Sequence, residues 1–330
     1  MFKILENTAG AIMTPEFVRL RADMRAGEAL KAIRLSGLDS DALYTIYVTD
    51  VEGKLLGVVQ MRTLLFAPED APLETLMDTA FYSVNVSDDQ ERAAMLVRKY
   101  DLLSLPVTDE AGRLVGAIGV SSIVDVIESE DTEDFERMAA LLPAESGYKS
   151  SSAWALAKRR LPWLLILMAA SILCERLIQS YESFLRASGS LGVLMVSCMP
   201  MLMDTGGNAG SQSSTTVIRA MALGQLAPRD TGTMLWKELR TALLCGLGLA
   251  LVNFLRLWLF TGATVAAAVS ISVAVLLAVV AANALGALLP MLARALNIDP
   301  ALMAGPLLTT VVDVLSLAIL FGLVSTFAFA

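Results

Sequence analysis

Polar side chains and glycines interrupt an apolar part of the chain in the stretch MPMLMDTGGNAGSQSSTT. Pro200 removes a backbone donor, and Gly206 and Gly207 allow backbone carbonyls to turn away from a helical ladder. Freed carbonyl oxygens, together with the amide oxygens of Asn208 and Gln212, are ligands that hard cations prefer. The pattern predicts a helix that is broken inside a membrane and lines a cation path.

A carboxylate stands alone in a second apolar segment, LLTTVVDVLSLAILFGLV, where apolar residues flank Asp313 on both sides. An ionisable group in such a segment costs free energy, so it marks a functional site. Pro306, Thr309, Thr310 and Asp313 follow the spacing i, i+3, i+4, i+7 and therefore share one helix face. We expect this face to line the same cation path, and Asp204, just before the glycines, could attract ions at its entrance.

Five apolar stretches could carry these residues across a bilayer, which a helix crosses in about 20 residues. They are residues 161–180, 189–222 (broken as described), 234–260, 264–291 and 303–329. Basic residues before the first stretch, Lys158, Arg159 and Arg160, favour a cytoplasmic N-terminal part, and five spans then place the C-terminus outside. A cytoplasmic Gly/Ser-rich loop at residues 199–216 is the alternative interpretation.

The composition separates two halves of the chain. The 330 residues are 55% hydrophobic with a mean hydropathy of +0.63, which is too apolar for an ordinary soluble protein. Residues 1–160 hold 17 Lys and Arg against 26 Asp and Glu, whereas residues 161–330 hold 8 against 7. An acidic soluble half therefore precedes a membrane half, and nucleic acid is not an expected partner. With no histidine and no Walker glycine–lysine motif, the chain is not expected to be an enzyme.

Two segments of the acidic half repeat at an offset of 59 residues, YVTDVEGKLLGVVQMRTLL from Tyr47 and PVTDEAGRLVGAIGVSSIV from Pro106. Each indicates a strand, a turn with an acid and a glycine, a second strand and a helix. Each also follows a helical stretch, at residues 26–35 and 88–100. The sequence therefore predicts a tandem α/β module.

Six carboxylates crowd into nine residues after the second repeat. They are Glu128, Glu130, Asp131, Glu133, Asp134 and Glu136. Carboxylates three or four apart on a helix repel each other unless a cation lies among them, as in a divalent-ion sensor. We expect a helix here as far as Leu142; a solvated acidic linker is the alternative.

The stretches PMLMDTGGNAGSQSSTTVIRAMALGQL and DPALMAGPLLTTVVDVLSLAILF resemble the two signature sequences of the MgtE-type magnesium channel family. The likeness continues through TAGAIMTPEFVRLRADM and VDVIESEDTEDFERM, and the repeats resemble a pair of cystathionine β-synthase (CBS) domains. The resemblance implies a homodimeric Mg²⁺ channel or transporter of the plasma membrane, with Asp313 of each chain at the selective point. It also implies three parts: a cytoplasmic CBS pair at residues 1–127 (about 8–66 and 73–127), an acidic connecting helix at 128–160 that plugs the pore, and a five-helix membrane domain at 161–330.

The CBS resemblance also implies a nucleotide ligand, because such pairs often bind adenine nucleotides such as ATP. The segment GVSSIVD matches the family's ribose-contacting pattern at Ser121, Ser122 and Asp125, whereas the first repeat has Phe66 in place of this aspartate. A structural role of Asp125, as a cap or as part of the acidic run that holds Mg²⁺, is the alternative.

Mg²⁺ is thus expected to be both the transported ion and the regulator, and membrane lipid and a second copy of the chain are the expected partners. Two other functions stay open: transport of another divalent cation such as manganese or cobalt, or transport driven by sodium or protons, and a membrane-anchored nucleotide or ion sensor. Family members usually carry a helical domain before the CBS pair, whereas here the first repeat begins near Thr8. We therefore expect weaker shutting by internal magnesium.

Overall fold

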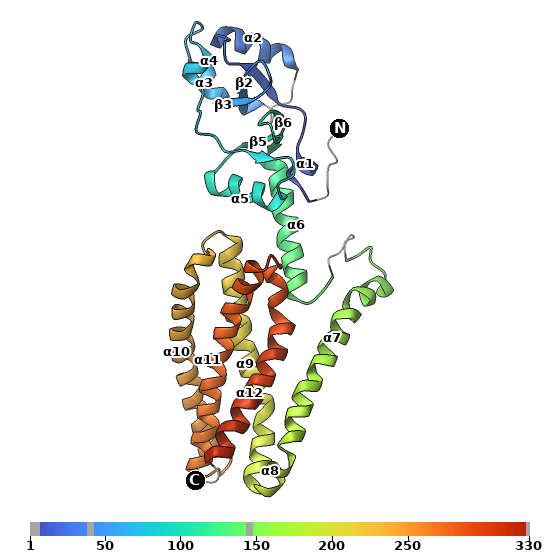
Figure 1. Ribbon diagram of the computed structural model, residues 1–330, viewed down its shortest axis with the longest axis vertical. Helices are drawn as coiled ribbons and strands as arrows, with labels where there is room; N and C mark the ends of the chain where they lie inside the picture. Colours follow the sequence, from blue (N-terminus) through green and yellow to red (C-terminus); the bar gives the residue numbers. More distant parts are fainter. Residues whose placement is uncertain (1–6, 38–42, 143–147, 328–330) are drawn as a thin grey trace. The chain divides into compact units, whose positions relative to one another are not determined.

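The computed structural model describes residues 7–37, 43–142 and 148–327, and the chain divides into two compact units, Met1–Thr132 and Glu133–Ala330 (Figure 1). The described residues of the first unit form helices and two sheets, whereas those of the second unit form helices only. The predicted fold class, an α/β repeat pair followed by an all-helical part, is confirmed.

Each repeat of the first unit forms a three-stranded sheet with the same strand order. The first strand pairs with the second in parallel, and the second pairs with the third in antiparallel fashion. The strands are β1 (Val18–Arg21), β2 (Thr45–Thr49) and β3 (Leu55–Gln60) in the first repeat, and β4 (Val84–Asn85), β5 (Ser104–Thr108) and β6 (Leu114–Gly119) in the second. The second and third strands recur at the 59-residue offset of the sequence repeat.

Helices close a separate apolar core in each repeat. Ile33 packs with Ile46 in the first core, and Val97 packs with Leu105 in the second. The helices of this unit are α1 (Ala9–Ile12), α2 (Ala26–Ser36), α3 (Met61–Phe66), α4 (Leu73–Leu76) and α5 (Gln90–Tyr100), followed by α6 (Val120–Met138), which continues into the second unit. The buried residues of α2 follow helical spacing, which is why the sequence pattern located this helix.

An aspartate fixes the turn between the last two strands of each repeat. The Oδ1 atom of Asp50 accepts a hydrogen bond from the amide of Lys54 at 2.8 Å, and Oδ1 of Asp109 accepts one from the amide of Arg113 at 2.8 Å. The hydrogen bond from the Arg113 amide is the main cause that lowers the pKa of Asp109 below its usual range. The repeated turn in the sequence is therefore a repeated hydrogen-bonding device.

Tyr47 joins the two repeats. Its hydroxyl lies 2.5 Å from the Oγ of Ser104, and its ring packs with Leu55 and Leu114, one residue from each repeat. The side chain is fully buried, and burial raises the pKa of Tyr47 to about 12. The junction between the repeats is thus an apolar contact with one internal polar pair.

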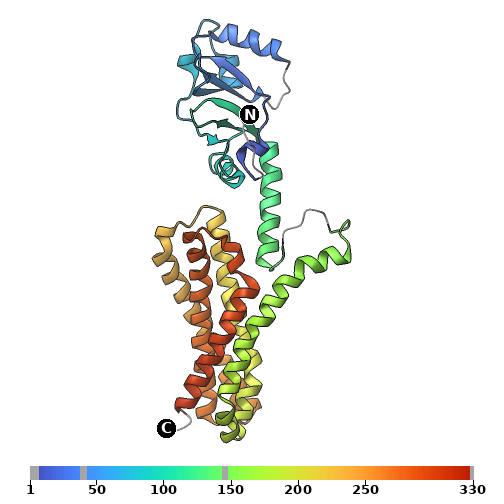
Figure 2. The same cartoon turned by 45° about the vertical axis from the view of Figure 1, so that its right-hand side comes forward.

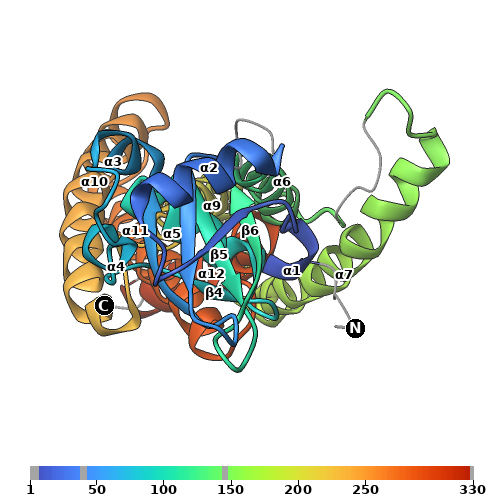
Figure 3. The same ribbon diagram turned by 90° about the horizontal axis from the view of Figure 1, so that it is seen from above.

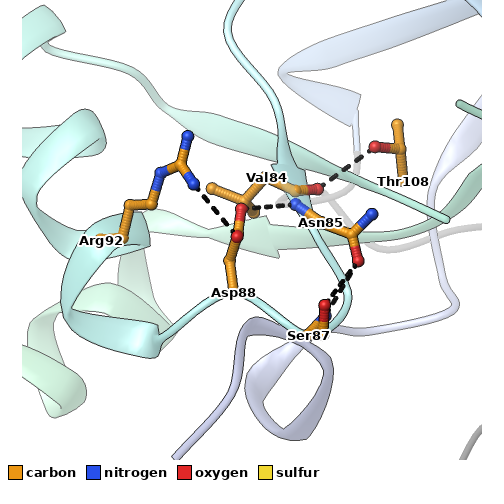
Figure 4. Close-up of polar contacts among 6 residues, drawn as sticks. All are labelled: Val84, Asn85, Ser87, Asp88, Arg92 and Thr108. Atoms are coloured by element: carbon orange, nitrogen blue, oxygen red, sulfur yellow. Dashed lines mark hydrogen bonds and ion pairs between the residues drawn. The ribbon is translucent and has the colours of Figure 1, made fainter. Parts of the chain in front are cut away.

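A polar loop holds the two-residue strand β4 in place (Figure 4). Asp88 accepts a hydrogen bond from the amide of Asn85 at 2.8 Å and pairs with Arg92 at 3.1 Å. Across the sheet, the hydroxyl of Thr108 donates to the carbonyl of Val84 at 3.4 Å. These side chains supplement a ladder that is too short to be stable by itself.

Five long helices follow the end of α6 in the second unit. They are α7 (Ala153–Ser180), α9 (Ser190–Ala222), α10 (Thr231–Phe260), α11 (Val265–Ala295) and α12 (Gly305–Phe327), with the short helices α8 (Glu182–Ala187), η2 (Pro228–Asp230) and η3 (Pro300–Met303) between them. Helices α9 to α12 form a bundle, and the N-terminal half of α7 stands away from it in both views (Figures 1 and 2).

Four helices of the described chain are long and apolar enough to cross a membrane, namely α7, α10 with η2, α11, and α12 with η3. Helix α9 has the length, at 33 residues, but its central residues are mostly glycine or polar. Five spans are therefore not confirmed by length and composition, although a helix lies at each of the five predicted positions.

Helix α9 is continuous, so the prediction of a helix broken at the glycines is wrong. The glycines instead allow close packing: a Cβ atom on Gly206 would lie 2.7 Å from the Oγ of Ser316, and one on Gly210 would lie 3.1 Å from the carbonyl oxygen of Ala282. Missing side chains therefore let α12 and α11 approach the α9 backbone.

The predicted connecting helix at residues 128–160 is also corrected. Helix α6 ends at Met138, and Ala140, with a φ of 53°, takes the chain out of the helix before Leu142. The next helix begins at Ala153, and residues 143–147 lie outside the described residues. The end of α6 packs on α12, since a Cβ atom on Gly305 would overlap the carbonyl oxygen of Met138.

Candidate functional site

Asp313 lies on α12 where this helix passes α7 and α9. Its charge interacts with that of Asp204 on α9 and with the buried thiol of Cys174 on α7. Asp313 is half-buried, whereas Asp204 is exposed. Two carboxylates thus repel each other in the helical unit, where a divalent cation would relieve their mutual repulsion.

A polar stripe runs along the exposed side of α9. Asp204, Asn208 and Gln212 follow each other at a spacing of four residues, so they lie on one helix face, and all three are exposed. The opposite face is buried and includes Met195, Leu202 and the packed glycines. Lipid offers no partner for carboxylates and amides, so the stripe requires water or another protein chain beside it.

Gly206 and Gly207 lie on the buried face of α9, not on the polar stripe. A Cβ atom on Gly207 would lie 3.2 Å from the Cγ2 of Thr309, so these two residues form part of the contact between α9 and α12. Because the helix is continuous, the backbone carbonyls of both glycines are not released toward a path as predicted.

Thr309 and Thr310 lie one turn before Asp313 on α12. Both hydroxyls donate to the carbonyl of Pro306, each at 2.9 Å, and both side chains are half-buried. Their hydrogens are therefore occupied while oxygen lone pairs can still accept a hydrogen bond. Thr310 keeps the predicted role as a candidate on the Asp313 face, whereas Thr309 also serves helix packing.

Another acid of this unit, Glu238 of α10, was not predicted to take part in the site. The Oγ of Ser213 on α9 lies 2.8 Å from Oε2 of Glu238 and 3.1 Å from the carbonyl oxygen of Asn283 on α11. The sequence signal was present, because Glu238 is an acid near the start of a predicted span. Its environment depends on three helices, which the sequence does not bring together.

Two carboxylates of the acidic run, Glu133 and Glu136, pair with arginines in the second unit. Arg137 forms ion pairs with both Glu133 and Asp299, and Arg159 pairs with Glu136 at 2.6 Å. In the first unit, the side chain of Gln90 donates to Glu130 at 2.7 Å. Among the residues that the structure describes, no cluster of three or more acids, cysteines or histidines could hold a metal ion. Glu130, Glu133 and Glu136 are therefore satisfied by partners of their own, which reduces the repulsion that the sequence suggested.

Comparisons with known proteins agree with the two-unit architecture. A family model described as MgtE, divalent cation transporter, matches residues 199–323, and the CBS domain model matches residues 9–70 and 73–129. The magnesium transporter MgtE of Thermus thermophilus is 37% identical over 95% of this chain and 68% of its own length. The magnesium transporter MgtE of Enterococcus faecalis is 33% identical over 98% of this chain and 69% of its own length. The chain belongs to the MgtE family.

A solved structure of an MgtE-family cytosolic domain, that of the Mg²⁺ channel MgtE in complex with ATP, is 39% identical over 38% of this chain and 50% of that chain, with a TM-score of 0.37. In this MgtE-family chain, the residues of the predicted nucleotide pattern lie in the first turns of α6. Ser121 and Asp125 are exposed and Ser122 is half-buried. Ser122 and Asp125 are three residues apart, so their oxygens lie on one helix face.

Proposed function

We propose that the protein carries Mg²⁺ across the plasma membrane and that Asp313 is its selective residue. The observation that supports this most is the half-buried position of Asp313 on the apolar helix α12, where its charge is felt by that of Asp204 on α9. Magnesium gives up its water ligands reluctantly. The carboxylates would therefore hold a hydrated ion through its waters, with Asn208, Gln212 and Thr310 as further oxygen partners.

A second copy of the chain would complete the path. The polar stripe of α9 is exposed in the single chain, and a homodimer that faces two such stripes toward one axis would give it a water-filled environment. Asp313 of both copies would then contribute to one divalent site. We propose that the N-terminal part is cytoplasmic and the C-terminus outside, because basic residues gather in the N-terminal part of α7 and around the connection from α9 to α10. They are Lys158, Arg159 and Arg160 in α7, and Arg219, Arg229, Lys237 and Arg240 around the connection.

We propose that the acidic run senses internal magnesium by competition with arginine. Arg137 now occupies Glu133 and Asp299, so an ion that binds these carboxylates must first displace the guanidinium. This differs from the sequence-based mechanism, in which Mg²⁺ simply relieves repulsion among Glu128, Glu130, Asp131, Glu133 and Asp134. The contact of Met138 with Gly305 would pass the change to α12, which carries Asp313.

Adenine nucleotide is proposed as a second ligand of the CBS pair, at Ser121, Ser122 and Asp125. The support is the predicted pattern and the ATP complex of the related cytosolic domain. Millimolar ATP should raise the melting temperature of the wild-type protein and not that of Asp125→Ala. Equal shifts in both would place any nucleotide elsewhere.

Flux through the purified protein in liposomes tests the main proposal. Asp313→Ala should abolish Mg²⁺ uptake while the protein still inserts and folds, and Asp313→Asn should be nearly as damaging because it keeps the shape and removes the charge. Glu182→Gln, which removes an exposed acid from α8, is the matched control and should leave flux unchanged. Undiminished flux in Asp313→Ala would show that Asp313 is not the selective residue.

Ion competition in the same liposomes separates the alternatives. If manganese or cobalt is carried in preference to Mg²⁺, that ion and not Mg²⁺ is the substrate. A dependence of flux on a sodium or proton gradient would indicate a carrier driven by that gradient. Absence of any flux in the wild-type protein would favour a membrane-anchored sensor. No enzyme activity is proposed.

A further inference from the structure

The outward side of α10 carries an apolar face that no described helix covers. Helix α10 lies at the edge of the second unit away from α7 (Figures 1 and 3). Its contact with neighbouring helices is a narrow stripe that consists of Met234, Ala242, Gly246, Asn253 and Leu257. The rest of the helix is mostly exposed, including Leu244 at 74%. We call the exposed residues Trp236, Arg240, Leu243, Leu244, Leu247, Leu251 and Trp258 the α10 outer face.

The two tryptophans of this face are spaced like the two interfaces of a bilayer. Trp236 and Trp258 are 22 positions apart, which corresponds to about 33 Å along a helix. At this spacing the two side chains leave the helix within about 40° of the same direction. The hydrocarbon core of a bilayer is about 30 Å thick, and tryptophan prefers its two boundaries. Trp236 is 61% exposed and Trp258 is 50% exposed, so both rings are available to the membrane.

The face itself is basic at one end only, because Arg256, at the other end of α10, donates to Asn253 on the packed side of the helix. Arg240 lies over the ring of Trp236, with 5.7 Å from the guanidinium carbon to the ring centroid, and Lys237 is exposed beside them. Glu238 is the sole acid of α10, and it is turned inward to Ser213. Two cations therefore lie within about one turn of Trp236, without a carboxylate on the same face.

We propose that the α10 outer face binds membrane lipid and that Trp236, Lys237 and Arg240 hold the phosphate of an anionic phospholipid. This rests on the membrane-spanning part of the proposed function and not on the identity of the carried ion. A second copy of the chain could also cover the leucines. It would not account for a spacing of the tryptophans that matches a bilayer, or for the basic residues at only one end of this face.

Fluorescence quenching in vesicles tests the proposal on the full chain. Substituting Trp154, Trp163 and Trp258 by phenylalanine leaves Trp236 as the single fluorophore. The vesicles contain phosphatidylcholine and a minor fraction of phosphatidylglycerol. Two preparations are compared, one with brominated phosphatidylcholine and one with brominated phosphatidylglycerol, at the same total amount of bromine. We expect brominated phosphatidylglycerol to be enriched about fivefold to 30-fold at Trp236, which is what one or two basic side chains near a membrane surface supply.

The matched variants locate the effect. Lys237→Gln with Arg240→Gln should reduce the enrichment to that of phosphatidylcholine, and high salt should do the same. Arg186→Gln, which removes an exposed cation from α8, should change nothing. A protein that retains only Trp258 should be quenched equally by both lipids.

Two results would overturn the proposal. Equal quenching of Trp236 by the two lipids would show that the α10 outer face has no preference for an anionic headgroup. No quenching of either tryptophan means that protein covers the face, and Leu247→Cys should then form disulfide-linked dimers. Magnesium flux measured on the same vesicles distinguishes a failure of lipid binding from a failure of the proposed transport function. Quenching requires only that the protein is inserted in the membrane, whereas flux requires transport.

Discussion

Gly286 of α11 lies against the carbonyl oxygen of Gly210 in α9, so closely that a Cβ atom at position 286 would overlap this oxygen. The two helices therefore meet backbone to backbone. Gly286→Ala should force them apart and lower the free energy of unfolding by about 1–3 kcal/mol, the usual cost of overpacking. Gly248→Ala is the control, since a Cβ there meets nothing within 4 Å. Thermal unfolding in detergent compares them, and equal melting temperatures would contradict the packing role of Gly286.

Tyr47 should make the first unit sensitive to alkali. Its pKa is raised to about 12 by burial, against about 10 in the unfolded chain. The folded state therefore disfavours the ionised ring, so the stabilisation is fully present below pH 10 and is lost as the pH rises from 10 to 12. Tyr47→Phe should remove this loss while it costs about 1 kcal/mol at neutral pH, because Ser104 loses its partner. Unfolding of the full chain at several pH values gives the result.

A matched variant guards the Tyr47 prediction against effects of other tyrosines. Tyr44→Phe removes the hydroxyl of a half-exposed ring and should leave both the neutral stability and the alkaline loss unchanged. An alkaline loss in Tyr47→Phe as large as in the wild type would assign the titration to another group.

Asp109 should make the second repeat sensitive to acid. Hydrogen bonds from Arg113 lower its pKa, so the carboxylate stabilises the fold above the unfolded pKa of about 4, and this contribution is lost as the pH falls through the folded pKa. Asp109→Asn should lower the melting temperature at pH 7 and flatten its decline below pH 4. Asp50→Asn is the matched variant in the first repeat, where the aspartate accepts from the amide of Lys54. The difference between the two variants gives the contribution of the Arg113 side chain, which bonds to Asp109.

Gly305 should couple the end of α6 to α12. A side chain at this position would overlap the carbonyl oxygen of Met138, and its φ of 53° also disfavours any other residue. Gly305→Ala should therefore displace α6 and weaken the shutting of flux by internal magnesium, with transport at low magnesium retained. Gly262→Ala is a closely matched control, because Gly262 has a φ of 64° and a Cβ atom there would meet nothing within 4 Å. Identical magnesium responses of the two variants would exclude the coupling.

Arg137 should set the magnesium concentration at which flux stops. It pairs with Glu133 and Asp299, so Arg137→Gln frees both carboxylates for an ion without removing either. We expect shutting at lower internal magnesium, by about threefold to tenfold if a partly exposed pair is worth about 1 kcal/mol. Arg186→Gln, which breaks the exposed pair with Glu182, should leave the response unchanged. A shift to higher magnesium would mean that the arginine acts as a latch and not as a competitor.

Local pattern was sufficient for much of the architecture. The 59-residue repeat determined two matching sheets, because the same strand and turn residues make the same hydrogen bonds at Asp50 and Asp109. Asp313 stood out because a carboxylate in an apolar segment has few roles other than a functional one. Both inferences need only residues that are neighbours along the chain.

The contacts of Gly206, Gly210 and Arg137 depended on the tertiary structure. A glycine can release a carbonyl from a helix or admit a neighbouring helix, because both effects follow from the missing Cβ. Only the positions of Ser316 and Gly286 decide between them, and α9 is continuous as a result. In the same way, the acidic run predicts repulsion until Asp299, 162 residues beyond Arg137, joins it in one ion-paired network. The sequence determined which groups are charged or lack a side chain, and packing between distant helices determined what each of them faces.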